Sequence, residues 1–306
     1  MKSFNPRSLA AVVALLVSAS ACAQRAATVG SPAASASSSG ENVSRLRGNG
    51  PPVGVQLWSF REAAKPDPIA MFKMTRGMGI THVETAGLYG MTGEALATAL
   101  QGAGLKATSM HVDLGEFKKN PQTVIAQAKA LGARYVGIAW YPHQGAFKEA
   151  DARQAIADFN SIGKTMKDAG LQFFYHNHGY EPVPYADGTL LDLIIKGTDP
   201  DLVKFEMDVL WTWLPGADPV SLINKYPGRF KLMHIKDMRP GVPRGNLSGG
   251  IPDSLKSVIG QGQVNWAALL KAAERDGFEY YYLEDETTAP VQNAPLSLAY
   301  LSTLKY

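Results

Sequence analysis

The chain repeats one local pattern from residue 53 to its C-terminus. A short apolar run typical of a strand is followed by a polar loop and then by a segment with helical periodicity. The junction from helix to strand recurs in nearly the same form at residues 77–80, 102–105 and 168–171, each time with glycine before an apolar residue. Glycine just past a helix supplies the left-handed residue that ends it, so the next strand begins at once.

Eight such repeats predict a barrel. Strand-like runs lie at 53–58, 82–85, 106–112, 135–140, 171–176, 203–208, 230–236 and 280–284. Helix-like segments lie at 68–78, 93–103, 121–131, 151–169, 189–196, 219–226, 266–275 and 295–304. Eight strand–helix units predict a single α/β domain, a parallel (β/α)8 TIM barrel. A doubly wound open sheet would place a glycine-rich turn after the first strand, and residues 59–62 contain no glycine.

The first fifty residues do not resemble this pattern. Basic residues precede an apolar stretch at 9–17, and small residues at 19–21 precede Cys22, so residues 1–22 are predicted to be a secretory signal peptide. The pattern resembles a bacterial lipobox, although Ala19 stands where leucine is usual. Lipidation of Cys22 is therefore predicted, with simple cleavage after Ala21 or Ala23 as the alternative.

The leader predicts an exported, periplasmic protein, either soluble or anchored to the membrane as a lipoprotein. Residues 23–50 are rich in Ala, Ser and Gly and predict a disordered linker, which leaves 51–306 for the catalytic barrel.

Cys22 is the only cysteine, so an intrachain disulfide is excluded. The net charge of +3 is not clustered and predicts no nucleic-acid partner. Association into a homo-oligomer is compatible with a barrel of this kind.

The C-terminal ends of four successive strands carry acidic or imidazole side chains. These are the group from His176 to Glu181, followed by Asp208, His234 and Glu284. Barrel enzymes draw their chemistry from strand C-termini. A carboxylate–imidazole set without thiolate suits one divalent ion, with manganese as the first choice and zinc, magnesium, cobalt or iron as alternatives.

Alternation of side chains along a strand refines these positions. Glu206 shares a face with Asp208 and would lie one layer deeper, where a buried acid must be paired or protonated. We therefore assign Glu206 a structural or supporting role, and we expect Asp113 and Asp237 to cap helices or pair with basic neighbours. The interval from 238 to 264 is rich in proline and glycine, and it either covers substrate or is a decorative insertion.

Several motifs resemble the sugar isomerase/epimerase superfamily with a xylose-isomerase-like barrel. They are residues 79–84, the His176-Asn177-His178-x-x-Glu181 motif, Asp208 before Trp211, the motif at 234–237, the approach to the last barrel helix at 260–266, and Glu284. In that family one residue from each of strands five to eight holds a divalent metal. The resemblance implies Asp208, His234 and Glu284 as ligands. Strand five departs from the family pattern; Glu181 is the predicted fourth ligand, with His176 at the strand tip as the alternative.

The chemistry implied by the resemblance is removal of a proton next to a carbonyl, through an enediolate. Glu284 and Glu181 would be the acid/base pair, and His178 would replace Glu181 if Glu181 only anchors the metal. Further residues would bind substrate: Lys236 by polarising an oxygen, Glu84, His111 and His176 by gripping hydroxyls, and Trp58, Trp140 and Trp211 by stacking. Packing is the alternative role for the three tryptophans.

The predicted function is a metal-dependent carbohydrate isomerase or epimerase. Because phosphorylated sugars are mainly cytoplasmic, export favours a free sugar or a 3-keto-glycoside as substrate. On a 3-keto-glycoside the same proton removal could lead to β-elimination, which would make the protein a lyase. A non-catalytic, lipid-anchored sugar-binding barrel is an alternative from another class. An apurinic-site endonuclease shares the fold but needs more metal ligands and a basic surface.

Overall fold

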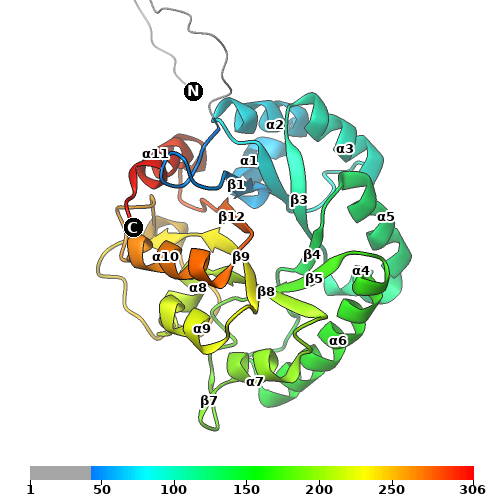
Figure 1. The fold of residues 1–306 in the computed structure, drawn as a ribbon, viewed down its shortest axis with the longest axis vertical. Helices are drawn as coiled ribbons and strands as arrows, with labels where there is room; N and C mark the ends of the chain where they lie inside the picture. Colours follow the sequence, from blue (N-terminus) through cyan, green and yellow to red (C-terminus); the bar gives the residue numbers. More distant parts are fainter. Residues whose placement is uncertain (1–42) are drawn as a thin grey trace, which may run out of the picture. The chain divides into compact units, whose positions relative to one another are not determined.

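The computed structural model describes residues 43–306, and these form a closed barrel of eight parallel strands with the order β1-β12-β9-β8-β5-β4-β3-β2 (Figure 1). The barrel strands are β1 (Val53–Gln56), β2 (His82–Thr85), β3 (Lys106–His111), β4 (Tyr135–Ile138), β5 (Gln172–His176), β8 (Val203–Asp208), β9 (Phe230–Ile235) and β12 (Tyr280–Leu283). The predicted TIM barrel is confirmed.

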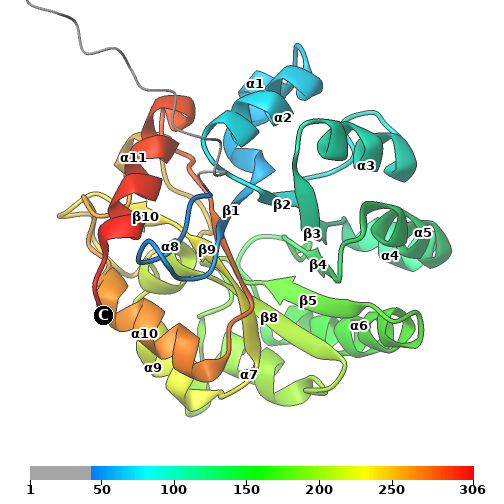
Figure 2. The ribbon, with the colours of Figure 1, turned by 45° about the horizontal axis from the view of Figure 1, so that its top comes forward.

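The helices surround the barrel as an outer ring (Figures 1 and 2). The longer ones are α2 (Pro68–Gly77), α3 (Gly93–Gly102), α5 (Pro121–Leu131), α6 (Glu149–Asp168), α7 (Leu190–Gly197), α9 (Pro219–Lys225), α10 (Trp266–Asp276) and α11 (Pro290–Thr303). Each coincides with a predicted helix, although α11 begins five residues before the predicted start at 295 and contains Pro295. At the three repeated junctions, Gly79, Gly104 and Gly170 have φ of +83°, +77° and +78°, as the junction pattern predicts.

Short elements at the C-terminal side of the strands are not predicted by periodicity. They are η1 (Leu57–Phe60), α1 (Arg61–Ala64), α4 (Leu114–Lys119), α8 (Val209–Trp213), η2 (Asp253–Leu255), and the pairs β6 (Pro184–Tyr185) with β7 (Gly188–Thr189) and β10 (Asp237–Met238) with β11 (Lys256–Ser257). Elements of two to six residues are too short to show a hydrophobic period. Of these elements, η1, α4, α8 and β11 contribute residues to the cavity described below.

The folded part begins earlier than the predicted boundary at Pro51. Leu46 is fully buried in the main core, and the Ser44 amide donates to the Gly79 carbonyl at 3.0 Å. Arg47 pairs with Glu274 of α10 at 2.7 Å. Residues 43–50 therefore belong to the barrel domain rather than to the linker. The predicted signal peptide, the Cys22 lipidation site and the rest of the linker lie outside the described residues.

The barrel interior is closed at one end by aromatic side chains. Tyr135, Phe174, Leu232 and Tyr282 form a separate buried cluster inside the strands, and the Tyr282 hydroxyl is hydrogen-bonded to Thr108 at 2.7 Å. The ring of Phe174 lies 5.5 Å from that of His111, in the next layer toward the C-terminal ends of the strands. Polar groups in that layer are therefore cut off from water on the aromatic side. Within residues 43–306, no helix is long and apolar enough to span a membrane.

Gly137 of β4 leaves the space that the Phe174 ring occupies, because a Cβ at this position would lie 2.5 Å from a ring carbon. We expect Gly137→Ala to lower the free energy of unfolding by about 1–3 kcal/mol through overpacking. Urea unfolding checks this. Gly115→Ala on α4 is the matched control, since nothing lies within 4 Å of its added Cβ. The control should be neutral or slightly stabilising. Wild-type stability in Gly137→Ala would contradict this packing.

Candidate active site

A cavity of about 650 Å³ opens at the C-terminal ends of the barrel strands. Its inner wall carries His111, His176, His234 and Glu284, and its outer wall includes Gly249, Gly250 and Ile251 from the interval between β10 and β11. That interval therefore lies over the strand ends, in the position expected of a loop that covers substrate. The volume is within the range of small-molecule sites in proteins.

One group of converging donors lies at the strand tips. Asp208 ends β8, His234 lies on β9, and Glu284 follows β12. His234 Nδ1 is 3.2 Å from Glu284 Oε2 and 3.9 Å from Asp208 Oδ2. The three residues can each offer a donor atom within 4.8 Å of the others. The structure thus brings together the three residues that the family resemblance implies as metal ligands.

Asp208 has an unsatisfied buried oxygen. Its residue is fully buried, its Oδ1 accepts the Trp211 amide at 2.9 Å, and its Oδ2 has no hydrogen-bond partner. Burial raises the pKa of Asp208 to about 6. A buried carboxylate oxygen without a donor is costly, and a cation at this point would compensate it. The donor set therefore fits a divalent metal.

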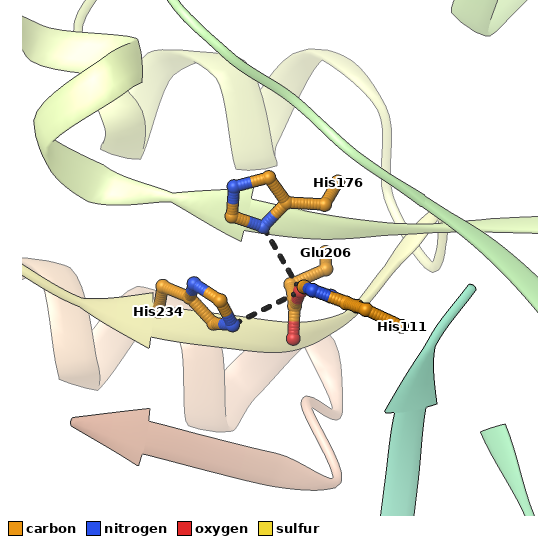
Figure 3. A group of neighbouring side chains, drawn as sticks. All are labelled: His111, His176, Glu206 and His234. Atoms are coloured by element: carbon orange, nitrogen blue, oxygen red, sulfur yellow. Dashed lines mark hydrogen bonds and ion pairs between the residues drawn. The ribbon is translucent and has the colours of Figure 1, made fainter. Parts of the chain in front are cut away.

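A second group lies one layer deeper, where three imidazoles surround the Glu206 carboxylate (Figure 3). Glu206 Oε2 is 2.9 Å from His176 Nδ1, 3.0 Å from His111 Nε2 and 3.1 Å from His234 Nε2. Glu84 supports this layer, because its Oε1 is 2.7 Å from His234 Nε2. The sequence-based assignment of Glu206 to a deeper layer agrees with this placement.

The deeper carboxylates fix how the imidazoles face the strand tips. Burial acts to raise the pKa of Glu206, but the surrounding histidines hold it well below its usual range, so Glu206 is an acceptor. His176 must then direct Nδ1–H at Glu206, which leaves Nε2 3.7 Å from Asp208 Oδ2. His234 likewise faces the deeper layer with Nε2 and the strand tips with Nδ1. Carboxylates that orient metal-binding imidazoles in this way are a common feature of metal sites.

Glu181 belongs to neither group of converging donors. It lies in the loop after β5, is fully buried, and does not line the cavity. Its Oε1 accepts from the Tyr175 hydroxyl at 2.5 Å and from the His178 amide at 2.8 Å. Burial raises the pKa of Glu181 to about 8. On strand five the structure places His176, the alternative, beside Asp208 and His234.

His178 faces the cavity and is stacked on Trp211, with ring centroids 5.7 Å apart and an interplanar angle of 28°. Its Nδ1 is buried without a hydrogen-bond partner. Trp211 is almost fully buried and supports His178, so packing accounts for it as well as stacking on a sugar does. Trp58 and Trp140 also line the cavity but are exposed.

Lys236 is the main cation of the strand tips. Its Nζ is 2.9 Å from Glu284 Oε2 and 3.6 Å from Asp208 Oδ2, and it also pairs with Glu286. Burial acts to raise the pKa of Glu284, yet Lys236 and His234 hold it well below its usual range. Glu284 is therefore ionised beside a fixed ammonium group.

Sequence reasoning gave no role to five polar residues that line the cavity: Gln56, Glu116, Gln127, Lys256 and Glu286. Glu286 shares a strand face with Glu284, so period-two alternation could have indicated it. Gln56 Nε2 donates to Glu84 Oε1 at 2.7 Å, and Lys256 Nζ lies 2.9 Å from Glu286 Oε2. No sequence signal indicates Lys256, because the path of its loop in the folded chain determines where it lies.

Asp237 is structural, since its carboxylate accepts hydrogen bonds from the Trp266 indole and from backbone amides.

The family model described as xylose isomerase-like TIM barrel matches residues 72–304. The chain therefore belongs to the xylose isomerase-like TIM barrel family. This agrees with the resemblance carried by the sequence motifs.

Solved structures share this fold, and curated relatives share part of the sequence. A sugar phosphate isomerase/epimerase from Parabacteroides distasonis is 26% identical with a TM-score of 0.68, covering 82% of this chain and 93% of that one. The IOLI protein, solved with a bound zinc atom, is 15% identical with a TM-score of 0.64, covering 82% and 98% of the two chains; this likeness shows the fold alone. An inosose dehydratase from Lacticaseibacillus casei is 25% identical over 171 residues. That match spans 54% of this chain and 55% of the relative, so the chain spans about half the length of the curated relatives it matches.

Proposed function

We propose that this chain is a metal-dependent enzyme that removes a proton next to the carbonyl of a carbohydrate. The observation that carries the proposal is the cluster of Asp208, His234 and Glu284 at the strand tips, with His176 Nε2 3.7 Å from Asp208 Oδ2. The deeper carboxylates Glu206 and Glu84 support it, because they orient the two imidazoles toward those oxygens.

These four residues would hold one divalent ion. Two nitrogen and two oxygen donors suit manganese, our first choice, as well as zinc, cobalt or iron(II). When bound, the ion would supply Lewis-acid chemistry at the carbonyl and hydroxyl oxygens of the substrate. The buried Asp208 Oδ2, which has no hydrogen-bond partner, would be satisfied by such a charge.

Glu284 and His178 are the proposed acid/base pair. Both line the cavity, whereas Glu181 is enclosed by tyrosine hydroxyls and the His178 amide and does not reach it. Glu284 takes the proton from carbon, and Lys236 keeps this carboxylate ionised beforehand. Lys236 also directs its ammonium group at the cavity, where it donates to a substrate oxygen. Glu84 is fully buried, and its carboxylate is 2.7 Å from His234 Nε2. It therefore orients His234 and does not contact substrate.

The fate of the electron pair released from the C–H bond divides the possible outcomes. Return of a proton to the opposite face of the same carbon, or to the neighbouring carbon, gives an epimerase or an isomerase. Departure of an oxygen substituent from the β-carbon, with a proton delivered by His178, gives a lyase. The inosose dehydratase match favours this second outcome, and the sugar phosphate isomerase/epimerase match favours the first. The substrate is proposed to be a free sugar or a 3-keto-glycoside.

Metal content tests the ligand assignment on strand five. We expect His176→Ala to lose the bound metal, because Nε2 is directed at Asp208, and Glu181→Ala to keep it. Elemental analysis of the purified variants after dialysis against Mn²⁺ measures the ratio of metal to chain. Circular dichroism controls for folding. Loss of metal in Glu181→Ala but not in His176→Ala would restore Glu181 as the ligand. A wild-type protein that takes up no metal would leave a non-catalytic sugar-binding barrel as the better account.

Solvent exchange tests the base. In D₂O with Mn²⁺, we expect the wild type to exchange a proton next to the carbonyl in one member of a panel of free sugars and 3-keto-glycosides. Glu284→Gln should slow that exchange by roughly 10²–10⁴-fold, since the amide cannot accept the proton. Proton NMR measures the rate. Glu94→Gln is the matched control, because Glu94 is an exposed glutamate on α3 that does not line the cavity. Exchange at the wild-type rate in Glu284→Gln would exclude Glu284 as the base.

A further inference from the structure

Two exposed tryptophans stand at the mouth of the cavity. Trp58 is 46% exposed and Trp140 is 43% exposed, and both line the cavity that contains the strand-tip residues. Trp58 follows β1 and Trp140 follows β4, and these strands are three positions apart around the closed barrel. The two indoles therefore belong to different parts of the rim rather than to one patch.

Trp58 is held in a fixed orientation. Its Nε1 donates to Glu286 Oε1 at 3.0 Å, and Glu286 is in turn paired with Lys256 at 2.9 Å. The Arg61 guanidinium lies over the indole, 5.0 Å from its centroid, and Arg61 does not line the cavity. One face of the ring is thus backed by Arg61, and the other is left for the cavity.

Trp140 is held in a similar way. His143 is stacked on it at 5.4 Å between centroids and 22° between planes, and His143 does not line the cavity. Tyr180 meets the indole at 4.5 Å and 64°. Gly249 packs so closely that an added Cβ would lie 3.3 Å from the indole. Each indole therefore has a backed face and an ordered position before any ligand arrives, which lowers the entropic cost of binding a ring against it.

The charges that line the cavity limit what its outer part, the rim around Trp58 and Trp140, can accept. The lining residues are those of the cavity as a whole. Of the described residues that line it, the lysines are Lys236 and Lys256. Lys236 pairs with Glu284 and Glu286, and Lys256 pairs with Asp253 and Glu286, both at 2.9 Å. Asp113 and Glu116 add negative charge to the same wall. A phosphate or carboxylate on the substrate would find no unpaired lysine or arginine there, so the outer cavity suits an uncharged ligand.

We propose that the outer cavity binds a second ring of an uncharged glycoside, with the apolar ring faces on Trp58 and Trp140. The ligand class is a neutral glycoside of at least two rings, whose inner ring lies over His176, Asp208, His234 and Glu284. Only the reaction of that inner ring rests on the proposed function; the outer subsite does not depend on it.

Equilibrium binding to the protein as purified, with unoxidised sugars as probes, tests the subsite apart from catalysis. The probes are matched pairs of glucose with cellobiose, galactose with lactose, and mannose with β-1,4-mannobiose, titrated by isothermal calorimetry. We expect at least one two-ring sugar to bind about tenfold or more tightly than its one-ring partner. Trp58→Ala and Trp140→Ala should each remove most of that difference while leaving the one-ring affinity unchanged.

Two further variants keep the result interpretable. Trp58→Phe keeps an aromatic face but loses the Nε1 donor to Glu286, so stacking predicts that it retains most of the two-ring preference; loss of the preference in Trp58→Phe would mean that Trp58 acts only through the Glu286 network. Trp213→Phe is the control, because Trp213 does not line the cavity. Equal affinities within every pair, binding of no two-ring sugar, or equal loss of one-ring and two-ring affinity in the tryptophan variants would each overturn the proposal. If the wild type exchanged no substrate proton with solvent, the proposed function would be wrong, but a measured two-ring preference in the binding titrations would still support the outer subsite.

Discussion

The site depends on one buried carboxylate held among three imidazoles. Glu206 is inaccessible to water, and His111, His176 and His234 each place a nitrogen within 2.9–3.1 Å of its Oε2. A buried charge needs such partners, and these partners are at the same time the side chains that face the cavity. The aromatic cluster of Tyr135, Phe174 and Tyr282 excludes water from the far side. The contacts that stabilise the buried Glu206 charge are therefore the same contacts that orient the three imidazoles.

The layer around Glu206 determines which groups face the strand tips, where the proposed reaction takes place. His176 and His234 have one nitrogen committed to the carboxylates, so each presents its other nitrogen to the strand tips, where Asp208 and Glu284 lie. Lys236 keeps Glu284 ionised and also pairs with Glu286. Glu286 in turn pairs with Lys256 and accepts a hydrogen bond from the Trp58 indole. One connected set of charges thus runs from the barrel interior to the rim. The proposed reaction uses its inner end, and the proposed outer subsite uses its rim.

The sequence predicted the barrel because each strand–helix unit carries its own hydrophobic period and its own terminating glycine. It also predicted that Asp208, His234 and Glu284 come together, because side chains at the C-terminal ends of neighbouring parallel strands meet at one end of the barrel. Glu181 follows the strand, where alternation no longer applies. Its direction is set by the Tyr175 hydroxyl and the His178 amide, and these contacts form only in the folded chain. Lys256 was missed for the same reason, since a long loop carries it to Glu286. The N-terminal boundary was placed late because one buried side chain, Leu46, has no periodic neighbours.

The central claim is that the deeper carboxylates direct His176 and His234 toward a metal at the strand tips. Anomalous diffraction from crystals grown with Mn²⁺ tests it most directly, because the signal locates the ion without reference to activity. The account predicts one ion, coordinated by His176 Nε2, His234 Nδ1, Asp208 and Glu284, with Glu206 outside the coordination shell. An ion bound instead by Glu206 among His111, His176 and His234 Nε2, or one bound by Glu181, would contradict it.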